Sequence, residues 1–217
     1  MSTCELGPCA MGVDVGKVLH VTVGFKPREK VLEVCYMART SSFNDLHDIA
    51  QRFNVQCCVI YAEPETRKAR EFQESETFPV FLCDYQERIL PGPQWDEKNN
   101  LVKVNRTEIC DTSHDLFTSP GRLIIPRRCD EVDRFAQHSR NIAKVLEEDP
   151  ETGSREYLYR KLGDDHYRHA LNYLHLASQR IGLSHNAKGR RFSEPEPAQM
   201  AFDVFAPNYG RERFFID

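Results

Sequence analysis

Long apolar runs are missing from this sequence. Runs such as 57–60 and 123–125 are far shorter than the roughly 18 residues that a helix needs to cross a bilayer, so we expect no contact with a membrane. The N-terminus lacks the basic start and apolar stretch of a signal peptide. A large excess of one charge is missing as well, because 29 Lys+Arg stand against 33 Asp+Glu. The net charge of -4 argues against nucleic-acid binding through bulk charge, but leaves room for a local basic patch around an acidic centre.

Paired cysteine motifs are absent too, although the chain contains 8 cysteines. No C-x-x-C occurs, and four cysteines stand inside apolar, strand-like runs, where a free thiol packs as a small hydrophobic group: Cys35, Cys57, Cys58 and Cys83. We therefore expect free thiols in a reducing cytosol rather than a secreted disulfide framework. The length of 217 residues fits one large domain or two small ones.

The N-terminal half alternates between strand and helix patterns. Apolar or alternating runs predict strands at 13–15, 18–25, 31–38, 57–61 and 78–83. Helical patterns lie between the later strands, at 43–53 and from 63–65 onward. Three antiparallel strands that lead into parallel α/β units predict a mixed α/β sheet with helices on both faces, which is the topology of an RNase H-like fold.

The rest of the chain predicts elements added to this sheet. After a long loop around Trp95, strands are expected at 101–104, 121–126 and 156–160, and helices at 105–117, 130–146 and 164–181. Gly, Arg, Pro and Glu then dominate the sequence. We therefore expect one domain at 1–184 and an extended C-terminal tail at 185–217.

Asp14 stands inside the apolar first strand, within the motif Gly12-Val-Asp-Val-Gly-Lys17. The motif is not a phosphate-binding P-loop, because Met11 replaces the first glycine and Val18 replaces the Ser or Thr. A carboxylate in the centre of a sheet is costly unless it has a partner, and a metal ion is the usual partner. The alternative is an Asp at a strand edge that faces solvent.

Glu63 follows the strand at 57–61 and directly precedes Pro64. Because a residue before proline favours extended geometry, we expect the strand to run through Glu63 and to place Tyr61 and Glu63 on one face. The carboxyl ends of parallel strands are where α/β sheets place their sites. The alternative is a Glu that stabilises the N-terminus of the next helix, with Pro64 at its first position.

Two carboxylates and two imidazoles stand within six residues at the start of the last predicted helix: Asp164, Asp165, His166 and His169. Asp165 and His169 are one turn apart, so they share a helix face. This density exceeds what an N-cap needs. The alternative is a capping pair accompanied by surface histidines.

Basic side chains occur in short groups that could contact phosphates. The groups are Arg67, Lys68 and Arg70, then Arg127 and Arg128, then Lys188, Arg190 and Arg191. For each group the alternative is an ordinary solvated surface.

Five motifs in this order and spacing resemble the C-terminal nuclease domain of the large terminase of tailed bacteriophages, over residues 10–182. They are the segments 12–17, 64–72, 104–108, 122–126 and 165–173. The resemblance implies an RNase H/RuvC-like fold and a metal-dependent endonuclease that cuts concatemeric phage DNA during packaging. It also implies a location in the cytoplasm of the bacterial host.

The resemblance implies roles for individual residues. Asp14 is the acid of the first strand and Asp165 that of the closing helix, whereas Tyr61 stands where relatives often carry a further Asp. With Glu63 in place of that acid, the implied catalytic residues are Asp14, Glu63, Asp165 and His169. The implied ligands of Mg²⁺ or Mn²⁺ are Asp14, Glu63, Asp164, Asp165 and His166. The implied DNA contacts are Lys17, Arg67, Lys68, Arg70, Arg127 and Arg128.

The implied partners are double-stranded DNA, a terminase ATPase domain, the small terminase subunit and the portal. The chain itself carries no ATPase signature, so it resembles an isolated nuclease domain. Two alternatives stay open: another RNase H-like nuclease, such as a Holliday-junction resolvase, and a catalytically silent docking domain. Tyr61 is the residue that favours the second alternative.

Overall fold

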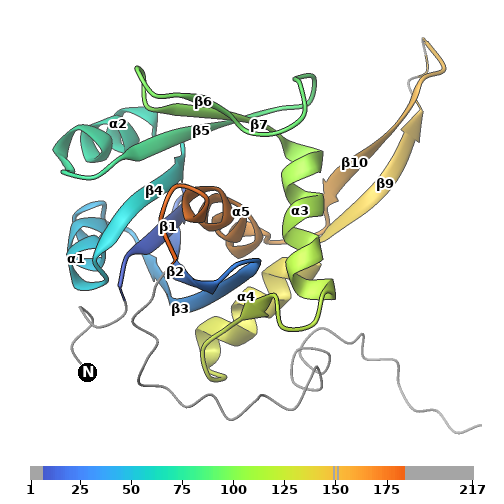
Figure 1. Ribbon diagram of the computed structural model, residues 1–217. Helices are drawn as coiled ribbons and strands as arrows, with labels where there is room; N and C mark the ends of the chain where they lie inside the picture. Colours follow the sequence, from blue (N-terminus) through green and yellow to red (C-terminus); the bar gives the residue numbers. More distant parts are fainter. Residues whose placement is uncertain (1–6, 149, 151, 184–217) are drawn as a thin grey trace, which may run out of the picture.

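The computed structural model describes residues 7–148, 150 and 152–183, and the tail expected at 185–217 lies outside this range. An eight-stranded sheet with the order β6-β7-β5-β4-β1-β2-β3-β8 forms the centre, and β9 and β10 form a separate pair (Figure 1). None of the described helices combines the length and apolar character needed to cross a membrane.

The first three strands form the predicted antiparallel meander. They are β1 (Cys9–Asp14), β2 (Leu19–Arg28) and β3 (Val31–Thr40). After α1 (Asn44–Arg52), β4 (Val55–Tyr61) pairs in parallel with β1, and after α2 (Thr66–Ser75), β5 (Val80–Gln86) pairs in parallel with β4. The resulting order β5-β4-β1-β2-β3, antiparallel on one side of β1 and parallel on the other, is the mixed α/β sheet of an RNase H-like fold.

Added elements extend the sheet and cover it. The strands are β6 (Gln94–Asp96), β7 (Leu101–Asn105), β8 (Leu123–Ile124), β9 (Ile142–Glu148) and β10 (Arg155–Lys161). The helices are α3 (Arg106–Thr118), α4 (Asp130–Arg140) and α5 (His166–Ser178). Asn105 caps the N-terminus of α3, because its side chain accepts a hydrogen bond from the Glu108 N–H (2.9 Å).

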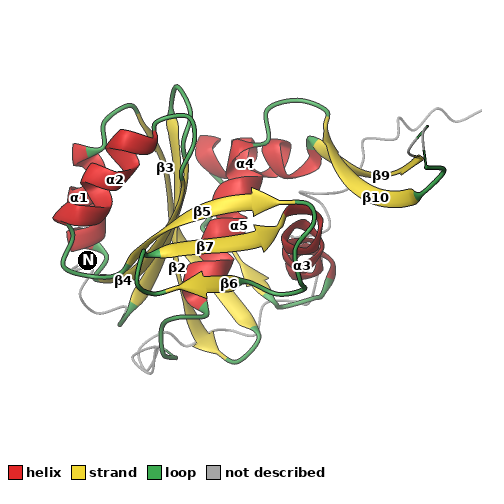
Figure 2. Cartoon of the chain, turned by 90° about the horizontal axis from the view of Figure 1, so that it is seen from above, coloured by secondary structure: helices red, strands yellow, loops and turns green. Residues whose placement is uncertain are grey.

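Helices cover both faces of the sheet, as predicted. Figure 2 shows α1 and α2 on one side of the strands and α4 and α5 on the other. Each face of the sheet has its own hydrophobic core. The core under α1 and α2 contains Leu46 and Phe72, and the core under α5 contains Leu171 and Leu174. Cys57, Cys58 and Cys83 are buried in these cores as free thiols, as expected for small hydrophobic groups.

Glycine allows α5 to lie directly on β1. A Cβ atom at Gly12 would stand 2.2 Å from Ala170 O and 2.2 Å from Leu174 N, so no larger residue fits there without backbone movement. The Thr22 hydroxyl on β2 donates to Ala170 O (3.0 Å), which ties the same turn of α5 to the sheet. This close contact brings the start of α5 to the carboxyl end of β1, where Asp14 lies.

Two predicted boundaries are wrong. The helix expected at 130–146 ends at Arg140, and Ile142–Glu148 is β9, which pairs antiparallel with β10. Because apolar residues at 142 and 145 fit a helical spacing as well as a half-exposed strand, periodicity did not separate the two. The segment around Trp95 also contains β6 rather than loop alone, since Trp95 packs edge-on against Phe81.

Candidate metal and phosphate site

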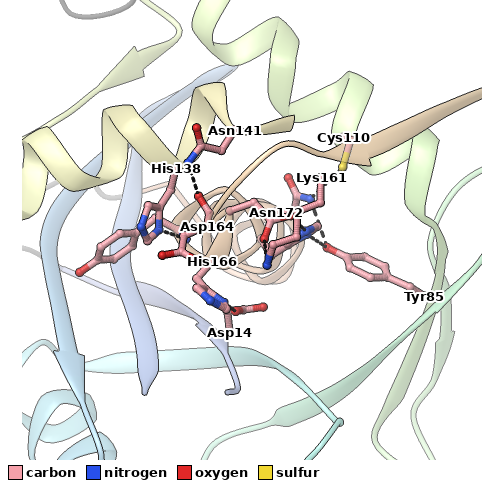
Figure 3. Close-up of polar contacts among 12 residues, drawn as sticks. Asp14, Tyr85, Cys110, His138, Asn141, Lys161, Asp164, His166 and Asn172 are labelled. Atoms are coloured by element: carbon pink, nitrogen blue, oxygen red, sulfur yellow. Dashed lines mark hydrogen bonds and ion pairs between the residues drawn. The ribbon is translucent and has the colours of Figure 1, made fainter. Parts of the chain in front are cut away.

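Asp14 is the last residue of β1, and its side chain is buried, with 5% of the residue exposed. Its Oδ2 atom lies 2.9 Å from Nδ1 of His166, the first residue of α5 (Figure 3). In the antiparallel pairing of β1 and β2, Asp14 stands opposite His20. The carboxylate predicted from the sequence therefore faces two histidines rather than solvent.

Asp14, His20 and His166 form a group that could hold a metal ion. Each offers one ligand atom, and these atoms all lie within 4.8 Å of one another. The rings of His20 and His166 are stacked, with centroids 4.7 Å apart. One carboxylate oxygen and two imidazole nitrogens at this spacing can converge on a single cation.

The protonation of the two histidines differs. Burial and the nearby charges of His166 and His138 lower the pKa of His20 to about 4, so its ring is neutral at pH 7. The hydrogen bond to Asp14 instead raises the pKa of His166. An imidazole ligates metal only in its neutral form, so His20 is ready to ligate, whereas the contact with Asp14 favours the protonated form of His166.

Asp165 precedes α5 and has a different environment. It is 3% exposed, its Oδ1 lies 3.0 Å from Lys161 Nζ, and its Oδ2 lies 3.2 Å from His169 Nε2. Burial alone would raise the pKa of Asp165, but the hydrogen bond from His169 and the charge of Lys161 lower it to about 2. Both oxygens of this predicted metal ligand therefore have protein partners.

His169 connects Asp165 to a buried hydrogen-bond chain. Its Nδ1 lies 3.1 Å from Tyr85 Oη, and Asn172 Nδ2 donates to the same oxygen (3.1 Å). The chain is consistent with one assignment of protons, in which Tyr85 donates to Nδ1 and Nε2–H donates to Asp165. The sequence prediction that Asp165 and His169 share a face of the helix is thus confirmed by a direct contact.

The expectation that β4 runs through Glu63 is wrong. The strand ends at Tyr61, the Glu63–Pro64 peptide bond is cis, and α2 begins only at Thr66, so Pro64 is not its first residue. Glu63 is exposed and is not part of the Asp14 group. The pairing with β5 reaches Ala62, whose N–H bonds to Cys83 O (3.4 Å), and the strand does not continue to Glu63.

Tyr61 is the last residue of β4 and belongs to a group of aromatic side chains. Its ring stacks on Tyr173 (6.0 Å between centroids, 8° between planes) and lies 5.8 Å from Tyr85. Burial and the nearby carboxylates of Asp14 and Glu63 raise the pKa of Tyr61, so its hydroxyl is neutral at pH 7. An aromatic cluster thus lies beside Asp14 at the end of β4.

A solvent-connected cavity of about 230 Å³ lies next to the Asp14 group. Its cationic and imidazole lining consists of Lys17, His20, Arg39, Arg134, His138 and His166. Asp164, which is exposed, also lines it, and its backbone oxygen accepts a hydrogen bond from Asn141 Nδ2 (2.8 Å). Lys17, Asp164 and His166 are thus the sequence candidates that the structure places in this cavity.

The other basic candidates are spread over the surface. On α2, which covers the opposite sheet face, Arg67 pairs with Glu71 and Lys68 with Glu65. Arg70 on the same helix bonds to the Gln73 side chain. Before α4, Arg128 pairs with Asp133 and Arg127 is exposed. Lys188, Arg190 and Arg191 lie outside the described residues.

Sequence reasoning missed four residues of this region: His20, His138, Arg39 and Arg134. A signal existed for His20, because an antiparallel turn centred on Lys17 pairs Asp14 with the residue three positions beyond it. The other three come from β3 and α4 and meet the site only through the tertiary fold, so no local pattern marks them.

No protein-family model matches the sequence, and no curated protein matches it. Among solved structures, the fold is similar to that of the large terminase nuclease from thermophilic phage G20c. The similarity has a TM-score of 0.43 and a sequence identity of 10%, and it covers 78% of this chain and 82% of that chain.

Proposed function

We propose that this protein is a divalent-metal-dependent endonuclease, the nuclease domain of a phage terminase large subunit that cuts concatemeric double-stranded DNA during genome packaging. The observation that carries the proposal is the group formed by Asp14, His20 and His166 at the carboxyl end of the central strand. The sequence motifs that resemble terminase nucleases support the substrate. By the same resemblance, the partners are a terminase ATPase domain, the small subunit and the portal, in the host cytoplasm.

The donor set favours one of the two expected ions. Mg²⁺ prefers oxygen ligands, whereas imidazole nitrogen suits transition metals. A set of one carboxylate oxygen and two imidazole nitrogens therefore fits Mn²⁺ better than Mg²⁺. The pKa of about 4 at His20 supports this assignment, since a neutral ring is available without loss of a proton.

Residues around the metal site would divide the work of phosphodiester hydrolysis. When bound, a divalent ion polarises a phosphoryl oxygen and lowers the pKa of a bound water. Asp14 supplies the negative charge that holds the ion and orients His166 through its hydrogen bond. Lys17 stands at the rim, where its ammonium group can hold the negative charge of the DNA.

The proposed roles of Asp165 and Asp164 concern a second ion. Two-metal sites place their ions about 3.5–4 Å apart, and both aspartates are close in sequence to His166. Asp165 has Lys161 on one oxygen and His169 on the other, so as a ligand it would share these oxygens with the ion or exchange a partner for it. Glu63 would have to approach from its exposed position after β4.

A plasmid-nicking assay tests the proposal. Supercoiled DNA is incubated with protein in Mn²⁺, Mg²⁺ or EDTA, and we expect cleavage with Mn²⁺, weaker cleavage with Mg²⁺ and none in EDTA. Asp14→Asn should reduce the rate by more than about 100-fold, since even residues outside a ligand set cost 10–100-fold. Asp48→Asn is the matched control, because Asp48 is exposed on α1. Equal cleavage by the Asp14 and Asp48 variants would reject the assignment.

A second candidate function is a catalytically silent docking domain of the same assembly. The observation that favours it is the Tyr61–Tyr85–Tyr173 cluster, in which Tyr61 is the residue that the resemblance aligns with a further acid. Mn²⁺ binding at Asp14 without any nicking of plasmid would favour this function. Preferential cutting of branched over linear DNA would instead favour a junction resolvase.

A further inference from the structure

We propose that the cavity beside Asp14 is a phosphate-binding site that holds one backbone phosphate of the DNA strand. This inference rests on the proposed function for the identity of the ligand. The cavity lies between β2, β3 and the helices α4 and α5, so residues distant in sequence converge on it. Its volume of about 230 Å³ corresponds to several water molecules at about 30 Å³ each, which is enough for a tetrahedral phosphate group.

The charges that line the cavity favour an anion. Arg39 is neutralised by Glu131 (Nη2–Oε1 3.0 Å). The cations left without an ion-pair partner among the described residues are Lys17 and Arg134, which face one acid, Asp164. Two unpaired cations against one carboxylate leave about one positive charge, which matches the single negative charge of a phosphodiester.

Arg134 provides the most specific observation. Its Nε atom is buried, and no described residue accepts a hydrogen bond from it. A buried guanidinium N–H without an acceptor costs free energy, and a phosphate oxygen is an acceptor that Arg binds well. Arg134 also lines the cavity, so a ligand there is within reach of its guanidinium group, and a shift of the side chain would give the Nε–H an acceptor.

His138 adds a neutral donor. Its Nδ1 accepts a hydrogen bond from Tyr167 N–H (3.3 Å), so the proton of the neutral ring is on Nε2. The Nε2–H group can donate to a phosphate oxygen without adding a further charge to the site.

The cavity adjoins the proposed metal site directly. His20 and His166 belong both to the metal-binding group and to the cavity lining. A phosphate in the cavity would therefore contact the metal site on one side and the cations Lys17 and Arg134 on the other. The cavity would thereby position the DNA strand next to the metal site, a role that the acidic residues alone do not fill.

Two measurements in EDTA, where no cleavage takes place, test the site. In the first, binding of a short fluorescent DNA duplex is followed by anisotropy at several salt concentrations. Lys17→Ala should weaken binding and reduce the slope of log K against log salt by about one unit. Lys98→Ala is the matched control, because Lys98 is exposed in the turn between β6 and β7 at the far edge of the sheet, and its slope should be that of the wild type.

In the second measurement, inorganic phosphate is added while the ring signals of the histidines are followed by NMR. Signals of His138 and His20 should shift in the wild type, and the shifts should be lost in Arg134→Gln and partly restored in Arg134→Lys. Circular dichroism of the Arg134 variants checks that they fold, and the exposed Lys17 provides a test that does not depend on them.

The outcomes separate the alternatives. Ring shifts together with a reduced salt slope for Lys17→Ala support the proposal. Ring shifts with an unchanged slope mean that the cavity takes free phosphate rather than DNA, and a reduced slope without ring shifts means a surface charge effect; either result overturns it. Plasmid cleavage by the wild type without any of these effects would reject the phosphate site and leave the nuclease function standing.

Discussion

Asp14 and Asp165 are two buried aspartates near the start of α5, and their neighbours differ. Asp14 contacts one histidine, stands opposite another and lies next to an open cavity. Asp165 has a protein partner on each oxygen, and its pKa is lowered to about 2. A carboxylate with a protein partner on each oxygen contributes to the stability of the fold, whereas one grouped with two imidazoles beside an open cavity is available to a ligand. Burial of an acid therefore does not by itself reveal its role.

The substitution Gly12→Ala should affect both aspartates at once. Its Cβ would stand 2.2 Å from two backbone atoms of α5, so β1, which ends at Asp14, and α5, which Asp165 directly precedes, must separate. We expect a loss of about 3 kcal/mol in the free energy of unfolding, measured by urea denaturation. Gly182→Ala is the control, because no atom lies within 4 Å of a Cβ there. Equal stability of the two variants would contradict the close packing of α5 on β1.

Stabilisation by metal should distinguish Asp14 from Asp165. At a Mn²⁺ concentration of about 100 times its dissociation constant, we expect about 2.7 kcal/mol of added stability in the wild type. Asp14→Asn should abolish this gain and Asp165→Asn should retain most of it, because only Asp14 belongs to the metal-binding group. Thermal melts with Mn²⁺ or EDTA provide the measurement. The opposite pattern would move the metal site to Asp165.

Stability in acid should depend on Asp165 rather than on Asp14. The pKa of Asp165 falls from 3.8 to about 2 on folding, so its ionised form stabilises the protein above about pH 4, and this stabilisation is lost as the pH falls through 2. The contribution is about 2 kcal/mol. Asp165→Asn should lose it at neutral pH, and its stability should change less between pH 4 and 2.

The exposed neighbour Asp164 provides the control for this experiment, and Asp164→Asn should behave as the wild type. If the two Asn variants have the same stability at pH 7, the pairing of Asp165 with Lys161 and His169 does not stabilise the fold.

The smallest expected effect is a change in the pKa of His166. The hydrogen bond to Asp14 raises its pKa, so the protonated ring stabilises the fold below about pH 6.5, and the stabilisation is lost as the pH rises through the folded-state pKa. In Asp14→Asn the pKa of His166, followed by NMR in EDTA, should fall. Asp165→Asn should change it less, because Asp165 is the weakest of the influences on this ring. An unchanged pKa in Asp14→Asn would contradict the contact.

Most of the central sheet could be predicted from the sequence. Alternating residues at 18–25 and 31–38 and the apolar run at 57–61 specify β2, β3 and β4, because side-chain period and burial follow directly from the residue pattern. The strand expected at 156–160 is confirmed as β10, but its partner β9 could not be predicted in this way. The residues of the two strands are mostly exposed or half exposed, with Leu146 and Tyr157 open to solvent, so hydrophobic periodicity carries little information there.

The candidate site was predictable only where local patterns mark it. Asp14 in an apolar strand and the pair of Asp165 and His169 one turn apart are local features: Asp14 is buried at the end of β1, and Asp165 contacts His169. Arg134 and His138 reach the site from α4 through packing, which a single sequence does not encode locally. Glu63 was misplaced because the tendency of a residue before proline to be extended says nothing about whether the next strand still pairs with it.

The arm formed by β9 and β10 has a consequence for how this chain can vary in length. Among the described strands, these two pair only with each other. Residues can therefore be inserted or deleted at the outer end of the arm without shifting the register of the eight-stranded sheet. The inner end is different, because Leu162 N–H bonds to Asn141 O (2.8 Å) and Lys161 pairs with Asp165. One residue added between Lys161 and Asp165 would displace the start of α5, so length variants should accumulate at the tip and stop at the base.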